Sequence, residues 1–336
     1  MTTLRIYTDN PVSQSPTWSS STVLLPMERE GRRRIRAALR NLFTTLRHVE
    51  NDAVMIFGNT YPLSASLATI ALRRLRPSVF LVRLDPLLLP PTLVRLRWVR
   101  AFTKPLNMLL VHTPNVAERY HAAYGIPLDK MYPIRFHHSL TGFEYEVTEG
   151  DYVFAGGDSQ HDYSTLLRAV DGTGIPVVIA TRKQLDDPIP ENVRVQAVSP
   201  QEFRNLMAGS RFIVLPLDMT RLRTAGQQSF LSAMALGKLV IVTDTVDAPY
   251  YIEHMQTGLL TPSRDVQALR EAIVWAWEHR EECRRIGTRA REVALPMDQE
   301  WCYSRILQLV REEYFKNRVD LSPGGNMVNT HDSKMG

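Results

Sequence analysis

The segment from Phe212 to Thr245, FIVLPLDMTRLRTAGQQSFLSAMALGKLVIVTDT, indicates the fold of this chain. A strand ends at Pro216, a basic loop follows, a helix runs from Gly226 to Gly237, and a second apolar strand comes next. Units of this kind build parallel sheets. The start of the helix offers backbone N–H groups and the positive end of its dipole, so it can bind an anion such as phosphate. Gly226 can equally be an ordinary helix-start glycine.

The same alternation of short apolar runs and helical segments continues on both sides of this segment. It predicts an α/β fold with two Rossmann-like domains, each built on a parallel sheet. Strands are expected at 4–8, 53–57, 79–84, 108–112, 131–134, 151–155, 176–180, 193–195, 212–216, 239–243 and 258–260. Helices are expected at 28–47, 62–76, 93–102, 115–124, 163–170, 200–209, 227–236, 266–278 and 281–293.

Length and composition predict two globular domains. The chain has 336 residues, which is more than a single hydrophobic core usually includes. Of these residues, 44% are hydrophobic and 22% are charged. The polar stretch 137–150 has no periodic pattern and is expected to be the hinge. We expect an N-terminal domain over 1–143, a C-terminal domain over 144–298, a helix over 299–320 that can cross back to the N-terminal domain, and a disordered tail over 321–336.

Cysteine content and hydropathy predict a cytoplasmic protein. The two cysteines, Cys283 and Cys302, lie in predicted helices, so neither a disulfide framework nor a cysteine-based zinc site is expected. No leader pattern and no long apolar stretch is present.

Five stretches agree in order and spacing with one known family. They are YVFAGGDSQHDYSTLLRAV (152–170), PVVIATRK (176–183), SPQEFRNLMAGSRFIVLPL (199–217), AGQQSFLSAMALGKLVIVTD (225–244) and YIEHMQTGLLTPSRDVQALREAI (251–273). Over residues 151–315 the chain resembles the C-terminal domain of GT-B glycosyltransferases, particularly the large retaining, family-four-like group of bacterial glycan and glycolipid synthases. In the first half only HTPNVAERYHAAYGIPLDKMYPI (112–134) looks similar.

This resemblance implies two sheets that face each other across a cleft, with a UDP- or GDP-sugar donor held by the C-terminal domain. Arg182 and Lys183 would neutralise the diphosphate without a metal, although they can also be a solvated pair at a strand end. Val198 and Ser199 would hold the base. The donor residues implied are Gly156, Gly157, Arg182, Lys183, Val198, Ser199, Arg223, Thr224, Ala225, Gly226, Gln227, Gln228 and Ser232. Beyond this donor, no cofactor is expected. On this reading a valine at Gly226 abolishes transfer but spares the fold.

The chain also departs from the family pattern. The two glutamates usual in the family correspond to Thr224 and Ser232, neither of which can act as a carboxylate. The usual arginine and lysine of the first glycine turn correspond to Gly157 and Asp162. The diphosphate would then draw on Arg182, Lys183, Arg221 or Arg223.

Catalytic candidates in the first half lie where predicted strands end. Asp85 and His112 are our choices, and Asp9 is a third candidate. Carboxyl ends of parallel strands are where α/β proteins bind ligands. A single histidine at such a position can equally be structural.

Basic charge is concentrated in the first half, since residues 1–150 carry a net charge of +8 and the rest −3. Segments 31–49 and 90–106 are basic, and in the second Leu93, Leu96, Val99 and Phe102 interleave with arginines, with Trp98 among them. This pattern is typical of a helix on an anionic membrane surface, or of a helix with one face in the domain core and its arginines in solvent. No nucleic-acid-binding module accompanies the charge, so nucleic acid is not expected as a partner.

The function implied is a metal-independent glycosyltransferase of polysaccharide biosynthesis. It would move a hexose from a nucleotide-diphosphate donor to a hydroxyl of a glycan or lipid-linked acceptor. The alternatives are a GT-B-fold nucleotide-sugar epimerase and a catalytically silent GT-B subunit that acts as a binding partner.

Overall fold

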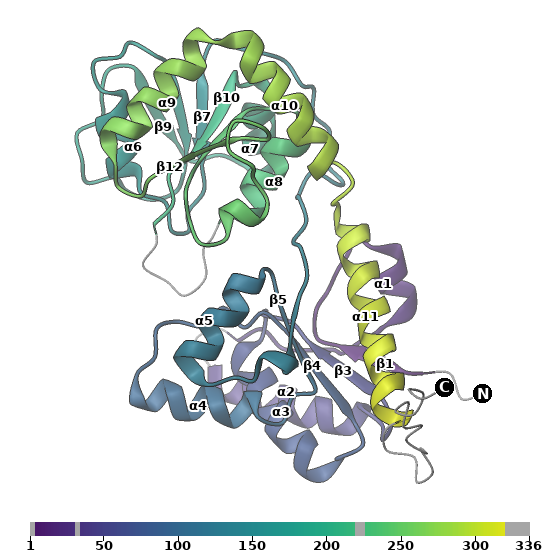
Figure 1. Ribbon diagram of the computed structural model, residues 1–336. Coiled ribbons are helices and arrows are strands. Elements are labelled where there is room, and N and C mark those ends of the chain that lie inside the picture. Colours follow the sequence, from purple (N-terminus) through teal and green to yellow (C-terminus); the bar gives the residue numbers. More distant parts are fainter. Residues whose placement is uncertain (1–3, 31–33, 219–225, 320–336) are drawn as a thin grey trace, which may run out of the picture.

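The computed structural model describes residues 4–30, 34–218 and 226–319, which form two domains connected by an extended linker and a long C-terminal helix (Figure 1). Each domain is built on a six-stranded sheet in which all neighbouring strands run parallel. The predicted α/β fold class, with two parallel sheets, is confirmed.

In the N-terminal domain the strand order is β2-β1-β3-β4-β5-β6. The strands are β1 Ile6–Thr8, β2 Val23–Leu24, β3 Val54–Phe57, β4 Phe80–Leu84, β5 Met108–Val111 and β6 Met131–Pro133. The helices are α1 Pro16–Ser21, α2 Arg34–His48, α3 Pro62–Leu75, α4 Leu93–Thr103 and α5 Pro114–Tyr124. The sequence did not predict α1 and β2, because six and two residues are too few to show a period.

Helix α2 begins at Arg34, later than predicted. The Asn41 side chain explains part of this difference, because its amide accepts from Glu28 N at 2.7 Å and donates to Glu28 O at 2.8 Å. The backbone of Glu28 is therefore bound by a side chain and does not belong to a helix.

Alternate residues of the N-terminal sheet enter two different cores, as the two-residue period of a strand requires. Met55, Leu81 and Leu109 pack against α2 to α5. Ile56 and Leu110 on the other face pack against α1 and the C-terminal helix. The carboxyl ends of the strands are thereby held between two helical layers.

The C-terminal domain repeats this arrangement with the strand order β12-β11-β10-β7-β8-β9. Its strands are β7 Val153–Gly156, β8 Val177–Ala180, β9 Val193–Gln196, β10 Phe212–Leu215, β11 Val240–Thr243 and β12 Leu259–Thr261. Its helices are α6 Tyr163–Val170, α7 Pro200–Gly209, α8 Gln227–Ala235, α9 Val266–Glu278 and α10 Arg280–Ala294. The described residues also include two 3-10 turns, η1 Leu128–Lys130 in the first domain and η2 Ala248–Tyr250 in the second.

The last helix, α11 Gln299–Val319, leaves the C-terminal domain and lies along the N-terminal one (Figure 1). Cys302, Ile306, Val310 and Tyr314, four residues apart, are all buried against the N-terminal sheet. Four-residue spacing places them on one face of the helix. The linker and the segment before α11 meet where they cross between the domains, since His138 N donates to Met297 O at 2.9 Å.

Candidate active site

The seam between the domains forms where strands of both sheets end. His112 directly follows β5, and Thr113 comes next. The Thr113 hydroxyl donates to Asp247 Oδ1 at 2.6 Å. The Tyr251 hydroxyl donates to His112 O at 2.9 Å and accepts from Phe136 N at 3.1 Å. Carboxyl ends of parallel strands are the usual ligand-binding edge of an open α/β sheet. Here the edges of the two domains are brought together.

A cavity of about 380 Å³ lies on the N-terminal side of this seam, and both predicted catalytic residues line it. Asp85 follows β4 and is 1% exposed. Its Oδ1 accepts from the Tyr120 hydroxyl at 2.7 Å and from Leu87 N at 3.1 Å. The carboxylate is therefore held in one orientation. The structure brings Asp85 and His112 together, although they come from different strands.

Further polar groups line the same cavity. His112 packs edge-on against Phe136, with ring centroids 4.4 Å apart. Asn10 donates to the Tyr303 hydroxyl at 3.3 Å, and Asn59 donates to the backbone oxygen of Asp85. Sequence reasoning missed Asn10, Asn59 and Tyr303. Each asparagine is the second residue after a strand, so both could have been found, whereas Tyr303 enters only because α11 crosses to this domain.

Asp9, the third carboxylate candidate, lies beneath the cavity and is not among the residues that line it. Its Oδ1 accepts from Gly58 N at 2.6 Å, and burial raises the pKa of its carboxyl to about 6. The buried Arg83 opposes this shift electrostatically, and burial lowers the pKa of Arg83 itself to about 10. These two residues form a buried charged layer below the site.

In the C-terminal domain, two side chains pack closely against the glycine turn at the end of β7. Gly157 has φ = +131°, and a Cβ there would lie 2.5 Å from His161 Cε1. A Cβ at Gly156 would lie 2.5 Å from Phe203. His161, which sequence reasoning did not select, stacks on Tyr163 with centroids 5.3 Å apart. Burial lowers its pKa to about 4, so the ring is neutral at pH 7.

Arg182 and Lys183 follow β8, as the sequence predicted, but Arg182 has a partner within the protein. Its Nη2 lies 2.5 Å from Asp158 Oδ2, and its backbone N donates to Asp158 Oδ1 at 2.8 Å. The Thr181 hydroxyl also donates to Asp158 Oδ1, at 3.0 Å. These contacts lower the pKa of Asp158. A diphosphate at this position would have to share Arg182 with a carboxylate.

The start of α8 adjoins the same turn. Asp218 N donates to Gln160 O at 2.8 Å, and Leu217, between β10 and α8, contacts Gly226. Gly226 has φ = +96° and caps α8. Gln227 is 2% exposed, and its Nε2 has no hydrogen-bond partner among the residues that the structure describes. Of the other residues predicted here, Gln228 is exposed, whereas Arg221, Arg223, Thr224 and Ala225 lie outside the described residues.

The expectation that Gly226→Val would spare the fold is wrong. A Cβ at this position would lie 2.9 Å from Leu217 Cδ1, and the positive φ disfavours any side chain. Gly226 is needed for the local backbone whether or not a phosphate approaches it.

The remaining predicted donor residues have structural contacts. Ser199 caps α7 by accepting from Glu202 N at 3.2 Å, and Val198 is half-buried against the core. Ser232 is 2% exposed, donates to Gln228 O at 2.6 Å and accepts from Ser139 N at 3.1 Å. At the position of the family's second glutamate, this chain therefore binds its own interdomain linker.

Across residues 4–30, 34–218 and 226–319, no three His, Cys, Asp or Glu side chains come together in a way that could hold a metal ion. The metal-independence expected from the sequence stays a prediction.

Comparisons with known proteins agree with this geometry. Residues 166–279 match the family model described as glycosyl transferases group 1. The comparison with curated proteins found no significant match. Among solved structures, sucrose-phosphate synthase from Thermosynechococcus elongatus superposes with a TM-score of 0.69 at 16% identity, over 88% of this chain and 84% of that one.

Two further solved structures are similar. Anabaena HepE in complex with UDP gives a TM-score of 0.66 at 12% identity, over 92% of this chain and 100% of that one. A mutant of S. aureus TarM, in complex with Fondaparinux, alpha-GlcNAc-glycerol and UDP, gives 0.64 at 11% identity, over 83% of this chain and 59% of that one. The chain thus has the GT-B fold of these solved structures, and its residues 166–279 match the family model of group 1 glycosyl transferases.

Proposed function

We propose that this protein transfers a hexose from a nucleoside-diphosphate sugar to a hydroxyl of a glycan or lipid-linked acceptor. The observation that carries this proposal is the cavity that contains Asp85 and His112. It adjoins the seam to the group 1 domain, because Tyr251 of that domain binds the backbone of His112 and Phe136, which both line the cavity.

The donor is proposed to lie against the C-terminal domain. Support comes from the start of α8, where Gln227 presents a buried amide without a partner among the described residues, and from the dipole of that helix. HepE has been solved with UDP and with UDP-glucose, which favours a UDP-sugar. Lys183, Arg182 shared with Asp158, and the α8 amides would stabilise the departing diphosphate without a metal.

The acceptor is proposed to occupy the N-terminal cavity. As the sugar–phosphate bond breaks, the acceptor hydroxyl must lose its proton, and a positioned carboxylate or imidazole can take it. Asp85 is fixed by Tyr120 and Leu87 N, so we assign it the proton-accepting role. His112 would contact the bound sugar. Leu110, Ile134 and Ile306 add apolar walls that suit an acceptor with an apolar part.

Peripheral binding to an anionic membrane is proposed for the surface formed by α2, α3 and α4. These helices contain nine arginines and no acidic residue. Ile35 and Phe43 on α2 are 71% and 69% exposed, and Leu93 and Val94 on α4 are both 81% exposed. Exposed apolar side chains among cations suit an anionic lipid surface. Within the described part of the chain, no helix is long and apolar enough to span a bilayer.

One observation favours a second candidate, a silent subunit that binds nucleotide without turnover. Ser232 stands where the family usually has a glutamate and is engaged by the linker residue Ser139. Binding and turnover must therefore be measured separately.

The test combines the melting temperature in UDP, GDP, ADP and TDP with release of nucleoside diphosphate from their sugars. Asp85→Asn keeps an acceptor oxygen for Tyr120 and should lower turnover by about 10²-fold or more with an unchanged nucleotide-dependent shift. Asp129→Asn, at an exposed position of the same domain, is the matched control. Nucleotide binding without release from any sugar would support the silent subunit, and no binding at all would contradict both.

A further inference from the structure

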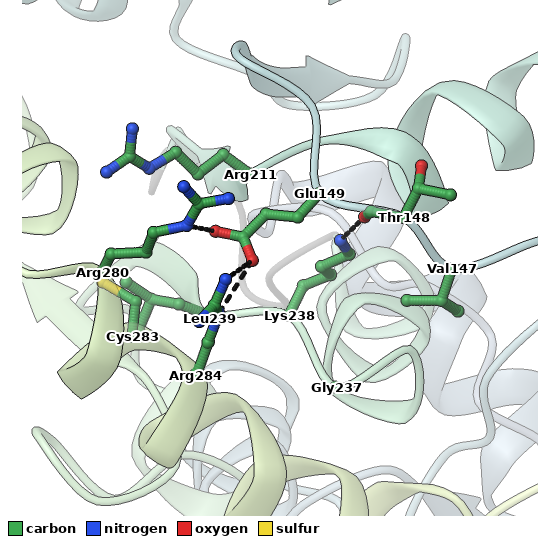
Figure 2. A pocket seen from close by; sticks show the side chains of 10 residues that line it. All are labelled: Val147, Thr148, Glu149, Arg211, Gly237, Lys238, Leu239, Arg280, Cys283 and Arg284. Carbon is green, nitrogen blue, oxygen red and sulfur yellow. Dashed lines mark hydrogen bonds and ion pairs between the residues drawn. The ribbon is translucent and has the colours of Figure 1, made fainter.

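A second cavity, of about 230 Å³ (Figure 2), is lined by residues of the C-terminal domain and the linker. It lies at the opposite end of the C-terminal sheet from the candidate active site. Arg211 comes directly before β10, and Lys238 lies two residues before β11, so the cavity is at the amino ends of the strands. Its other walls are the linker at Glu149 and the first turns of α10, with Arg280 and Arg284. None of these residues belongs to the donor or acceptor site proposed above.

Four cationic side chains and one carboxylate line this cavity. Glu149 accepts from Arg280 Nε at 2.5 Å and from Arg284 Nε at 2.9 Å, as Figure 2 shows. These contacts lower the pKa of Glu149, so it is ionised at neutral pH. Outside the lining, Glu281 also pairs with Arg284 at 2.6 Å. With these two carboxylates against Arg211, Lys238, Arg280 and Arg284, the site keeps an excess of positive charge.

Two of the cations are partly removed from water and are bound by neutral carbonyl groups. Lys238 is 6% exposed, and its Nζ donates to Ser210 O at 2.7 Å and to Thr148 O. Burial lowers its pKa to about 8. The Arg211 guanidinium lies 4.3 Å from the Trp277 ring centroid and donates through Nη2 to Trp277 O. Within the described residues, its buried Nε has no hydrogen-bond partner.

We infer that this cavity binds a small phosphate-bearing dianion, either inorganic phosphate or a phosphate monoester. Arginine forks and an ammonium group suit phosphate oxygens, and a dianion would offset the charge that Glu149 leaves uncompensated. The volume is below the usual range of about 300 to 1,000 Å³ for drug-sized ligands, which favours a small anion over a nucleotide sugar. The bound anion would join Arg211, directly before β10, to Arg280 and Arg284 of α10, and Glu149 of the linker would compete with it for these two α10 arginines.

The experiment is a titration of the full-length protein with inorganic phosphate at constant ionic strength, followed by 31P NMR line width. Arg280→Gln should weaken binding by about tenfold. The matched control is Arg285→Gln, in the same helix, whose side chain pairs with Glu282 and does not line the cavity. It should bind phosphate like the parent.

Glu149→Gln separates the anion site from a purely structural charge cluster. It removes the one carboxylate of the lining, so phosphate affinity should rise several-fold even though the protein without phosphate becomes less stable. A second titration with Arg182→Gln reports on the proposed donor site, which also attracts phosphate. Binding weakened by Arg182→Gln but not by Arg280→Gln, or binding unchanged in Glu149→Gln, would overturn the inference without affecting the proposed transferase activity.

Discussion

At Gly226 the backbone has φ = +96°, and Leu217 lies against the place that a side chain would occupy. The sequence placed this glycine correctly at the start of a helix. It could not show Leu217, because the contact depends on how the loop after β10 returns to α8. The local backbone therefore requires Gly226, which also lies at the start of α8, where we propose that the donor binds.

Gly226→Ala should consequently lower the free energy of unfolding by more than about 1–2 kcal/mol, the cost typical of a side chain in the left-handed region. Gly172→Ala is the matched control, because Gly172 has φ = +72° but no atom within 4 Å of the place that a Cβ would take. Urea unfolding of both variants measures the difference, which reports the Leu217 contact. Equal losses in the two variants would show that Leu217 yields without cost.

Arg182 and Ser232 likewise have partners that the sequence could not predict. The sequence placed Arg182 at a strand end and Ser232 within the helix that follows Gly226. The structure adds that Arg182 pairs with Asp158 and that Ser232 binds Ser139 of the linker. Neither partner can be chosen from spacing alone, since many oxygen atoms follow strand ends in an α/β domain.

At the scale of elements, α2 and α4 had two readings from sequence, a core helix and a membrane-surface helix. In the structure each helix has a face buried in the domain and an outer face with exposed apolar residues. Ala37, Ala38 and Val99 are buried in the domain, whereas Ile35 and Phe43 point outward and are largely exposed. The inward face of each helix packs in the domain core. This packing does not explain why apolar residues also lie on the outward face.

A double variant, Ile35→Ser with Phe43→Ser, should reduce recovery with anionic vesicles by about tenfold or more, because each buried apolar side chain contributes roughly 1.5–3 kcal/mol. Vesicle flotation at low and high salt is the measurement. Phe315→Ser is the control, since this aromatic residue is 56% exposed on α11, which covers the opposite face of the sheet. Equal recovery of the parent with neutral and anionic vesicles at both salt concentrations would exclude the proposed surface.

For the whole molecule, the arrangement of the domains depends on few contacts at the seam. Tyr251 provides two of them, to His112 O and Phe136 N. Burial raises the pKa of its hydroxyl above the ordinary tyrosine value, so it stays a neutral donor across the physiological range. The orientation of the cavity that holds His112 is therefore tied to the C-terminal domain.

Tyr251→Phe should cost about 1–3 kcal/mol of unfolding free energy, because it leaves two part-buried backbone groups, His112 O and Phe136 N, without their partner. The neighbouring Tyr250→Phe should be nearly neutral, since the ring that contacts Arg135 is retained. Denaturant unfolding gives the stabilities, and small-angle scattering detects a change in domain arrangement. Tyr251→Phe with the stability and scattering of the parent would show that the seam is held by other contacts.

The sequence by itself determined the α/β class, the two parallel sheets, most helix and strand positions and the GT-B resemblance. The class, the sheets and the element positions follow from apolar periodicity and glycine placement, which are local along the chain. The resemblance to GT-B glycosyltransferases depends instead on the order and spacing of five sequence stretches. Asp85 and His112 were selected for the same reason, because a strand end can be located from a pattern. The strand order within each sheet was not available from such a pattern.

Only the tertiary structure decided which side chains share a site. It joined Asp85, His112 and Tyr303 around one cavity, placed Arg182 against Asp158, and brought four cations to the linker residue Glu149. These groups come from segments far apart in the chain, including α11, which crosses from one domain to the other. Their proximity results from packing between elements, and no local pattern in the sequence encodes it.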